Sequence, residues 1–304
     1  MATEYASAAG LANSAPSGRC SALDEVTAVL VTFNSAHCAP ALGRQLAGWP
    51  HVIVADNGSL DATPAAIRQQ LPQAQVLELG ENRGFGAANN AALARVATPY
   101  ALLINPDCEL DAAQARALLA TAQAWPEAAI VAPQLVDAGG RPQLNYGWTR
   151  HLWTARGPGA EGVACVANAC GAALLLRLSA LQQRDWFDTR FFLYYEDEDL
   201  CLRLTQAGQP VLIDPAVRVV HANRGSVRGP RPLRVEWGRG YHHARSKILF
   251  TAKHRGSALA ARQRRRALAA ACGLLLLRVF APSPKHVARV WGRIQGLWSA
   301  PVRY

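Results

Sequence analysis

Short apolar runs alternate with alanine-rich segments along the first 125 residues, and this alternation restricts the chain to few architectures. Four apolar runs predict β-strands, over residues 26–32, 51–55, 75–79 and 100–104. Four segments between and after them favour helix, over residues 39–47, 63–70, 86–96 and 112–124. Because the strands are apolar almost throughout, the pattern predicts an α/β fold with a buried parallel sheet. Ligands of such sheets bind beyond the carboxyl ends of the strands.

The remainder of the chain is less regular. Residues 137–162 are rich in Gly, Pro and aromatic residues and predict a long loop. Further strands are predicted over residues 172–176, 211–213 and 217–220, and a helical, basic pattern begins at Pro232. We therefore expect three parts: a disordered leader over 1–24, an α/β domain over 25–228 and a basic helical region over 229–304.

Charge is distributed unevenly along the chain. Residues 1–223 carry 14 Arg and no Lys against 20 acids, whereas residues 224–304 carry 18 Arg and Lys against the single acid Glu236. A basic region of this kind can bind nucleic acid, anionic lipid or a diphosphate-bearing substrate, so charge alone leaves the partner open. Half of the residues are hydrophobic and 17% are charged, which excludes a chain that is disordered throughout.

The cysteines and the apolar runs indicate a cytoplasmic protein. Seven cysteines, an odd number without a CxxC pair, favour reduced thiols over a disulfide framework or a zinc site. The N-terminus lacks a basic stretch followed by an apolar core, so it does not have the pattern of a signal peptide. The best candidate for a membrane span, residues 267–277, is shorter than the roughly 18 residues needed to cross a bilayer.

Polar residues follow the first two predicted strands. Thr32 and Asn34 come at the end of the first strand, and Asp56 and Asn57 follow the second. Each pair can hydrogen-bond a base, a ribose or a phosphate, although the same residue types are common in turns. Two such groups on successive strands favour a binding site.

The third predicted strand is followed by a glycine-rich segment that opens a helix, residues 80–90 (GENRGFGAANN). Glycine lets the backbone approach a ligand closely, and a helix N-terminus favours phosphate. The segment matches the dinucleotide fingerprint GxGxxG only weakly. That motif follows the first strand of its fold, and here Asn89 occupies its last position.

The fourth predicted strand ends in Asn105-Pro106-Asp107. A carboxylate held by a proline-stiffened turn at the end of a strand suits a divalent cation that bridges a diphosphate, and Mg²⁺ takes oxygen ligands. The alternative is that Asp107 caps the following helix. Far downstream, His221 ends a predicted strand and is a candidate for a further ligand, although a single histidine is more often structural.

Residues 186–200 (WFDTRFFLYYEDEDL) place four consecutive acids directly after an aromatic run. Acids in the first turn of a helix are favoured by its dipole, which is the simpler explanation. Packing carboxylates beside aromatic rings raises at least one pKa, however, as suits a general base. We favour a catalytic role, because acids with aromatic and apolar neighbours make a poor solvated face.

Together these motifs resemble the family 2 inverting glycosyltransferases, especially the rhamnosyltransferase-like branch that builds O-antigen and other cell-surface polysaccharides. The motifs occur in the order VTFNS, DNGSLD, ENRGFGAANN, INPDCEL, GAALLLR, FDTRFFLYYEDEDLCLRL and then a histidine, between about residues 26 and 225. The resemblance implies a GT-A fold, in which a Rossmann-like nucleotide-binding sheet is joined to an acceptor-binding half. In this chain, basic C-terminal helices would follow.

The resemblance also implies roles for individual residues. The nucleoside would be held by Thr32, Asn34, Asp56 and Asn57. The donor pocket would be lined by Asn82, Gly84, Phe85, Asn89 and Asn105. The last place of the family's DxD metal motif would be filled by Asp107, and His221 would complete a Mg²⁺ or Mn²⁺ site. Here the first place of that motif is Asn105, which leaves one charged ligand.

By the same matching, Asp197 would be the catalytic base, with Glu196 and Asp199 orienting the base or the acceptor. The expected reaction is a single displacement that moves a sugar from a nucleotide-sugar donor to a hydroxyl of a glycan or polyprenyl-linked acceptor. We expect L-rhamnose from dTDP-rhamnose, while UDP-hexosamine and UDP-galactofuranose stay open as donors. The oligomeric state is not predicted.

The basic C-terminal region predicts helices over residues 234–253, 259–280 and 285–297. Their Arg and Lys residues are interleaved with Leu, Val and the two tryptophans Trp291 and Trp298. This pattern fits helices that lie on an anionic membrane surface, here the inner face of the cytoplasmic membrane. A solvated basic face or an oligomer surface is the alternative.

Two other functional classes compete with a transferase. The basic C-terminal region is compatible with nucleic-acid binding, but the chain has no helix-turn-helix, zinc-finger or RNP-like motif, so we expect no nucleic-acid partner. A nicotinamide-dependent oxidoreductase needs GxGxxG after the first strand, and the residues there, Phe33-Asn34-Ser35-Ala36, do not supply it.

Overall fold

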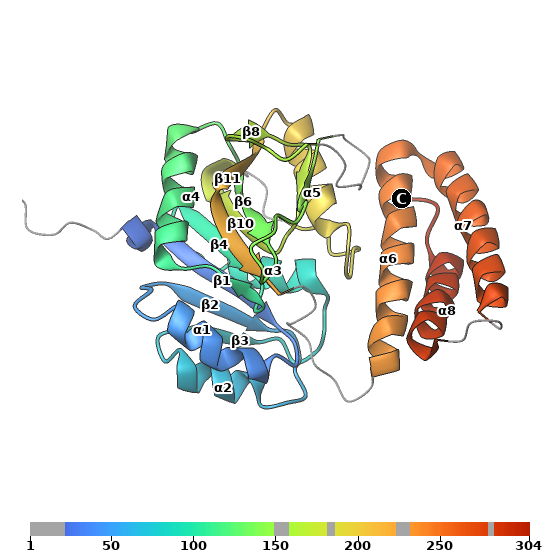
Figure 1. The fold of residues 1–304 in the computed structure, drawn as a ribbon, viewed down its shortest axis with the longest axis horizontal. Helices are drawn as coiled ribbons and strands as arrows, with labels where there is room; N and C mark the ends of the chain where they lie inside the picture. The colour runs from blue at the N-terminus through green and yellow to red at the C-terminus, as the bar shows by residue number, and fades with distance from the viewer. Residues whose placement is uncertain (1–21, 149–157, 181–185, 223–231, 279–282) are drawn as a thin grey trace, which may run out of the picture.

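The computed structural model describes residues 22–148, 158–180, 186–222, 232–278 and 283–304 (Figure 1). The leader predicted over 1–24 lies outside these ranges except for its last three residues, which belong to a short 3₁₀ helix, η1 (Ala22–Glu25). The boundary predicted at residues 228 and 229 also lies outside them.

A nine-stranded sheet forms the centre of the fold, with strand order β3-β2-β1-β4-β10-β6-β11-β5 and with β8 paired to β11. Its strands are β1 (Val26–Thr32), β2 (Val52–Asp56), β3 (Gln75–Glu78), β4 (Tyr100–Ile104), β5 (Cys108–Glu109), β6 (Ile130–Val136), β8 (Ala164–Cys165), β10 (Ala173–Arg177) and β11 (Val211–His221). A separate two-stranded sheet joins β7 (Tyr146–Gly147) to β9 (Asn168–Ala169). Strands β1 to β4 are parallel, as predicted, whereas β10 runs antiparallel to both of its neighbours.

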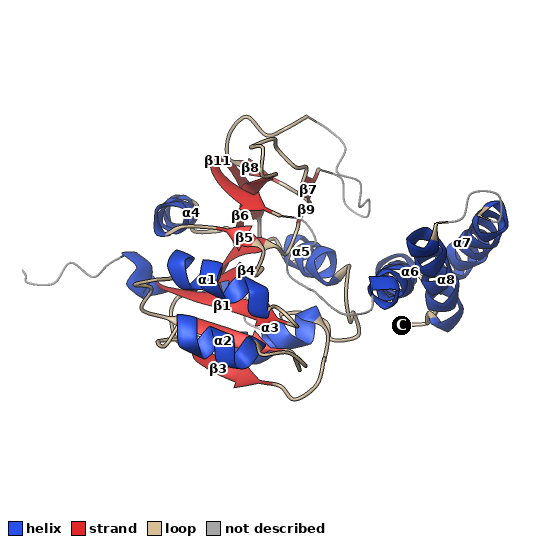
Figure 2. Ribbon diagram, turned by 60° about the horizontal axis from the view of Figure 1, so that its bottom comes forward, coloured by secondary structure: helices blue, strands red, loops and turns tan. Residues whose placement is uncertain are grey.

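Helices cover both faces of the sheet (Figure 2). They are α1 (Ala39–Gln45), α2 (Thr63–Gln70), α3 (Phe85–Leu93), α4 (Ala112–Ala124) and α5 (Glu196–Gln206), with short 3₁₀ helices η2 (Ala36–Cys38) and η3 (Leu178–Ala180). Because side chains alternate along a strand, Leu30 of β1 belongs to the core under α1, α2 and α4, whereas Val29 belongs to the core under α3 and α5. The sheet is therefore buried on both sides.

Two parts of the sheet differ from the sequence prediction. Strand β6 was not predicted, because Pro133 in its middle lacks the N–H that an interior strand normally uses. Only the first two residues of β6 pair with β10, so Pro133 lies beyond that ladder and pairs with β11 alone. The two strands predicted over 211–213 and 217–220 are one strand, β11, with a register shift between Asp214 and Arg218.

Three long helices follow the sheet domain: α6 (Pro232–Arg255), α7 (Ser257–Leu277) and α8 (Pro284–Ser299). Figure 1 shows α6 next to α5, with α7 and α8 on its far side. Among the described helices, none is both long enough and apolar enough to span a membrane. Glycines bring α6 and α8 close together, because a Cβ at Gly240, Gly292 or Gly296 would lie only 2.0–2.2 Å from a carbonyl oxygen of the facing helix.

Gly292→Ala is expected to destabilise the protein by about 1–3 kcal/mol, because the new methyl group would force α6 and α8 apart. Its Cβ would lie 2.0 Å from the carbonyl oxygen of Trp237. The matched control is Gly238→Ala, where a Cβ meets no atom within 4 Å and should stabilise α6 by about 0.5–1 kcal/mol. Urea denaturation of both variants measures the difference, and equal effects would contradict the packing argument.

Candidate active site

The carboxyl ends of β1 and β2 meet in a buried hydrogen-bond network around Asp56. The Asp56 side chain accepts hydrogen bonds from the Thr32 hydroxyl at 3.0 Å, the Ser59 hydroxyl at 2.6 Å and the Ser59 N–H at 2.9 Å. The pairing of Thr32 with Asp56 in the β1–β2 register brings these groups together. Ser59 was not among the predicted site residues, although it belongs to the same DNGSLD motif.

Asn34 joins the two loops that follow β1 and β2. Its N–H donates to the Ser59 hydroxyl at 2.9 Å, and its side-chain oxygen accepts from the Leu60 N–H at 2.8 Å. The backbone of Asn34 has a φ of 52°, a left-handed conformation that asparagine tolerates better than most residues. The loop is thus held beside the end of β2, and the Leu60 side chain is left 93% exposed.

Asn57 holds the glycine-rich loop that follows β3. Its amide nitrogen donates to the Asn82 side-chain oxygen at 3.0 Å and to the Gly84 carbonyl at 3.2 Å, and its amide oxygen accepts from the Arg83 N–H at 2.8 Å. Both amide hydrogens are therefore used within the protein. Asn57 therefore positions the glycine-rich loop, and its contact with a nucleoside stays a prediction.

The glycine-rich loop crosses directly over the segment that precedes the acidic helix. Gly84 has a φ of +88°, and a Cβ there would lie 2.3 Å from the Phe192 carbonyl oxygen, so only glycine fits. The Phe85 N–H donates to the same carbonyl at 2.9 Å. Within α3, the buried Asn89 amide donates to the Phe85 carbonyl at 3.0 Å. Residues 84 and 85 are therefore in backbone contact with the aromatic run.

A second link between α3 and the aromatic run comes from Asn90, which was not predicted as a site residue. Its side chain accepts from the Phe187 N–H at 2.9 Å and donates to the Phe187 carbonyl at 2.8 Å, across 97 positions of sequence. The Asn90 side chain thus pairs with both the backbone N–H and the carbonyl of Phe187. The Asn-Asn pair at the end of ENRGFGAANN was the available signal.

The predicted metal ligands Asp107 and His221 lie together. Strand β5 pairs antiparallel with the end of β11, which sets Cys108 opposite His221. The His221 Nε2 lies 3.6 Å from the Asp107 Oδ1, and ligand atoms of Asp107, Cys108 and His221 all lie within 4.8 Å of one another. Burial, and then the charge of Asp107, raises the pKa of the Cys108 thiol well above its usual value, so the thiol stays neutral.

This donor set fits a divalent cation. One carboxylate and one imidazole supply two ligands, which leaves most of the coordination shell for oxygen atoms of a diphosphate. The Nδ1 of His221 is buried and makes no hydrogen bond to the described residues, so the ring is not committed elsewhere through that atom. The backbone of Asn105 holds this turn in place. Its N–H donates to the Ala172 carbonyl at 2.8 Å, and its carbonyl accepts from the Cys108 N–H at 3.0 Å.

Asp197 lies in the first turn of α5, and both of its carboxylate oxygens are held by backbone N–H groups. Oδ2 accepts from Gly171 at 2.8 Å and Oδ1 accepts from Glu198 at 3.0 Å. The side chain keeps partial exposure. Burial raises the pKa of Asp197 above its ordinary value, while these hydrogen bonds oppose that rise. A carboxylate whose pKa is raised in this way is more basic than usual, as suits a general base.

The two neighbouring glutamates differ from Asp197. Glu196 and Glu198 are each 5% exposed, and each has a buried Oε2 with no hydrogen-bond partner among the described residues. Burial, followed by the charge of Asp197, raises the pKa of both side chains well above the usual value. Two backbone N–H groups donate to Asp197 and oppose the rise in its pKa, which distinguishes Asp197 from the two glutamates.

One short segment, residues 171 and 172, joins Asp197 to the turn that carries Asp107. Gly171 donates its N–H to Asp197, and the carbonyl of the next residue, Ala172, accepts from Asn105 and from the Cys108 thiol at 3.3 Å. A Cβ at Gly171 would lie 3.5 Å from the Asp197 side chain and 3.4 Å from the Phe85 ring. Residues 171 and 172 are thus in contact with the end of β4, with the glycine-rich loop and with the acidic helix.

The backbone just before the acidic helix is strained. Tyr194 and Tyr195 have φ values of 68° and 70°, in the left-handed region where bulky side chains are rare. Such residues cost of order 1–3 kcal/mol each and persist only where surrounding contacts hold them. Tyr195 directly precedes Glu196, so the strain lies at the start of the helix that carries Asp197.

Helix α6 supplies the contacts that hold this strained segment, residues 192–195. His242 stacks on Phe192 with ring centroids 4.4 Å apart, and the Ser246 hydroxyl donates to the Leu193 carbonyl at 2.9 Å. Burial, aided by the charge of Arg245, lowers the pKa of His242 to about 4, so its ring packs as a neutral group. Sequence reasoning missed this role, because the residues lie within a basic helical pattern.

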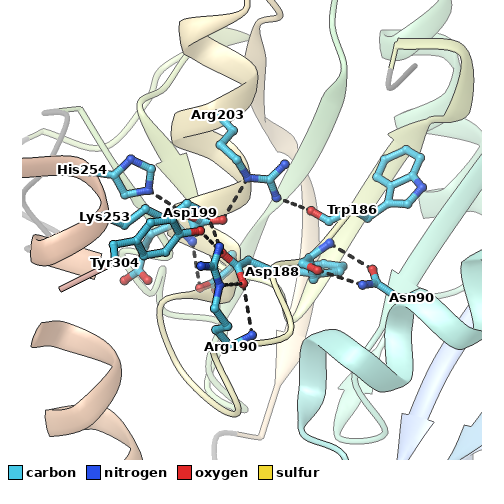
Figure 3. Close-up of polar contacts among 12 residues, drawn as sticks. Asn90, Trp186, Asp188, Arg190, Asp199, Arg203, Lys253, His254 and Tyr304 are labelled. Atoms are coloured by element: carbon cyan, nitrogen blue, oxygen red, sulfur yellow. Dashed lines mark hydrogen bonds and ion pairs between the residues drawn. The ribbon is translucent and has the colours of Figure 1, made fainter. Parts of the chain in front are cut away.

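Asp199 is fully buried and ties α5 to α6 (Figure 3). Its carboxylate pairs with Arg203 at 2.9 Å on its own helix, and with Lys253 and His254 of α6 at 2.7 Å each. Burial opposes ionisation, but the hydrogen bonds from His254 and Lys253 outweigh it and hold the pKa of Asp199 below its usual value. The proposed support of the base by Asp199 is therefore indirect, since its partners fix the helix.

Lys253 bridges the buried Asp199 and the partly buried Asp188, and Lys253→Met is expected to destabilise the protein by about 1–3 kcal/mol, because it removes one of the hydrogen-bonded cationic partners of each carboxylate. Its Nζ lies 2.7 Å from both Asp188 and Asp199. The folded-state pKa of each acid is lowered, so this stabilisation is present above the ordinary value of 3.8 and is lost as pH falls below it. Urea denaturation at pH 7 and at acidic pH measures both effects.

The matched control is Arg68→Met, which breaks the ion pair between Arg68 and Glu78. Both side chains of that pair are 52% exposed, so the expected cost is at most about 1 kcal/mol. If Lys253→Met costs no more than Arg68→Met at pH 7, the contact between α5 and α6 does not depend on buried charge.

Comparisons with known proteins agree with this geometry. Residues 27–181 match the family model described as Glycosyl transferase family 2. An N-acetylglucosaminyl-diphospho-decaprenol L-rhamnosyltransferase of Mycobacterium tuberculosis is 30% identical over 240 residues, covering 67% of this chain and 76% of that protein. A low-salt glycan biosynthesis hexosyltransferase of Haloferax volcanii is 25% identical over 195 residues, covering 60% of this chain and 62% of that protein.

The fold is also similar to that of a solved mannosyltransferase from Pyrobaculum calidifontis, in complex with GDP-Man and Mn²⁺. The two structures superpose with a TM-score of 0.52 at 19% sequence identity, covering 90% of this chain and 87% of that chain. Similarity at this level concerns the fold, and it confirms the expected GT-A architecture.

Proposed function

This chain belongs to glycosyltransferase family 2, and we propose that it moves L-rhamnose from dTDP-rhamnose, with inversion, to a hydroxyl of a lipid-linked or cell-surface glycan acceptor. The observation that carries the proposal is the pair of backbone N–H groups that hold both oxygens of the Asp197 carboxylate, between two buried glutamates. The choice of sugar and of a lipid-linked acceptor is supported by the name of the mycobacterial relative.

In the proposed reaction, the acceptor hydroxyl loses its proton to the Asp197 carboxylate as its oxygen attacks the anomeric carbon of the donor. A new carbon–oxygen bond forms on one face of the sugar while the bond to the diphosphate breaks on the other, which inverts the configuration. Asp199 would act by holding α5 against α6.

The donor is proposed to lie along the carboxyl ends of β1, β2 and β4. Thr32, Asn34 and Asp56 would contact the nucleoside directly or through the loops that they hold. Asn57 would act by fixing the loop of Asn82, Gly84 and Phe85 against the donor. In this arrangement the sugar lies between that loop and Gly171.

Asp107 and His221 are proposed to hold Mg²⁺ or Mn²⁺. When bound there, the cation would neutralise the diphosphate that leaves the sugar, which is where charge develops in the transition state. The buried Nδ1 of His221 and the 3.6 Å separation of the two side chains support this assignment. The presence of Mn²⁺ in the complex of the Pyrobaculum mannosyltransferase agrees with it.

A thermal-shift screen of nucleotide-sugars, each with and without Mg²⁺ or Mn²⁺, tests the donor and the cation together. A ligand at about 100 times its Kd stabilises the native state by about 2.7 kcal/mol, so dTDP-rhamnose with a cation should raise the Tm the most. A larger shift with UDP-hexosamine or UDP-galactofuranose would replace the donor assignment. The anomeric configuration of the product, read by NMR, tests inversion.

A further inference from the structure

An open aromatic groove runs between α6 and α8 and is not used by the candidate active site. It has a volume of about 500 Å³ and is lined mainly by Trp237 and Tyr241 of α6 and by Trp291, Ile294 and Trp298 of α8. Trp291 is 49% exposed and Trp298 is 79% exposed. Large aromatic side chains gathered on an exposed face mark an interaction surface.

The polar atoms of the groove are satisfied within the protein. The Trp237 indole N–H donates to the Gln295 side chain at 2.6 Å, and the Ser299 hydroxyl donates to the Tyr241 hydroxyl at 3.0 Å. Trp237 and Tyr241 stack on each other with centroids 5.1 Å apart. The groove therefore presents ring surface to its partner and few hydrogen-bonding groups, which favours an apolar partner over a sugar.

The helices that form the groove belong to a strongly basic region. The chain from residue 224 has 18 Arg and Lys and only Glu236 as an acid, and Glu236 is buried in ion pairs with Arg239 and Arg289. Arg234, three positions before Trp237 on the same helix face, is exposed. An apolar face in a basic region complements an anionic lipid surface.

The groove adjoins the candidate active site through a short aromatic path. The Tyr241 ring meets His242 edge-on at 5.1 Å, and His242 stacks on Phe192 at 4.4 Å. Phe192 in turn accepts the backbone hydrogen bond from Phe85 in the donor loop. A surface bound at the groove would therefore lie beside the segment that leads to Asp197.

We propose that the α6–α8 groove docks the protein on the surface of an anionic lipid bilayer, with Trp291 and Trp298 entering the headgroup boundary. The inference rests on the proposed function, because docking there would bring a lipid-linked acceptor to the strained segment before α5. Burial of the indole rings supplies apolar contact, and Arg234 supplies attraction to the headgroups.

Co-sedimentation of the full chain with vesicles tests the proposal, using phosphatidylcholine vesicles with and without phosphatidylglycerol. Binding should require phosphatidylglycerol and weaken as salt rises. Replacement of Trp291 or Trp298 by Ser should lower the partition coefficient roughly tenfold each, because one indole ring fewer is then transferred from water to the bilayer. Arg234→Gln should lower it roughly fivefold.

The matched control is Trp125→Ser, which removes an indole that is 45% exposed at the end of α4, away from the groove. It should leave vesicle binding unchanged. No pelleting with anionic vesicles, or equal losses in Trp125→Ser and Trp298→Ser, would overturn the proposal. So would a lipid-independent dimer that Trp298→Ser dissociates, since a second copy would then occupy the groove.

The same variants separate docking from catalysis. With a short, water-soluble acceptor, Trp298→Ser should keep wild-type turnover, and the thermal shift caused by nucleotide-sugars should not change when vesicles are added. If vesicle binding fails while sugar transfer stays intact, only the docking proposal is overturned. Failure of nucleotide-sugar binding with intact vesicle binding would remove the proposed function alone.

Discussion

Asp197→Asn should lower kcat by about 10²–10⁴-fold, the range expected when a general base is removed. The substitution keeps the size of the side chain but removes the negative charge that would accept the acceptor proton. Donor binding should survive, because the donor contacts proposed here come from the ends of β1, β2 and β4. Single-turnover transfer measures the loss, and the Tm shift with nucleotide-sugar measures the binding that remains.

Glu196→Gln is the matched control for Asp197→Asn. Burial, followed by the charge of Asp197, raises the pKa of the buried Glu196, so a neutral amide of the same size should disturb this position little and lower kcat only slightly. The acid limb of the pH–rate profile should lie above the ordinary aspartate value of 3.8, because burial raises the pKa of Asp197 and activity falls as this group is protonated. A normal rate for Asp197→Asn would assign the base elsewhere.

Asp107→Asn should lower kcat/KM by about 10²–10³-fold, as for other groups that stabilise charge in a transition state. The amide keeps the shape of the turn between β4 and β5 but removes the single charged ligand of the cation. The concentration of Mn²⁺ needed for half-maximal activity should rise at the same time. A readout independent of turnover is the additional Tm shift that Mn²⁺ gives in the presence of a nucleoside diphosphate.

Cys108→Ala is the control for the metal site. The thiol lies in the same cluster as Asp107, but burial keeps it neutral, so the Mn²⁺ requirement should not change even if the buried cavity lowers stability. His221→Gln should resemble Asp107→Asn. If both ligand variants keep the wild-type Mn²⁺ response, the cation does not bind at this pair.

Much of the sheet could be predicted from the sequence, because local pattern determines it. The bounds predicted over 26–32, 63–70, 100–104 and 112–124 are those of β1, α2, β4 and α4. Strand β6 escaped prediction because a proline interrupts its pattern, and the continuity of β11 past Pro215 escaped for the same reason. Both prolines are tolerated because of the way in which neighbouring strands pair with β6 and β11. That pairing cannot be read from the sequence of one strand.

The candidate site shows a similar division. The pairing of β5 with β11 brings Asp107 and His221 together, as motif order led us to expect. The contacts that Asn57 and Asp199 make could not be read from their motifs, because the partners lie 25 and 55 positions away. The basic residues of α6 were expected to face solvent or lipid, yet Lys253 lies inside the contact with α5 and is 12% exposed.

Residues 194 and 195 keep a conformation that their own sequence disfavours, and the side chains that hold them come from α6. Exchange of domains between relatives should therefore fail when the junction falls between α5 and α6. The segment before α5 would then come from one parent and α6 from the other, and their contacts would not match. Hybrid enzymes should be joined upstream of residue 186 or beyond α8. Residues that alter acceptor preference are then to be sought as pairs, one on the loop and one on the helix, and not as single positions.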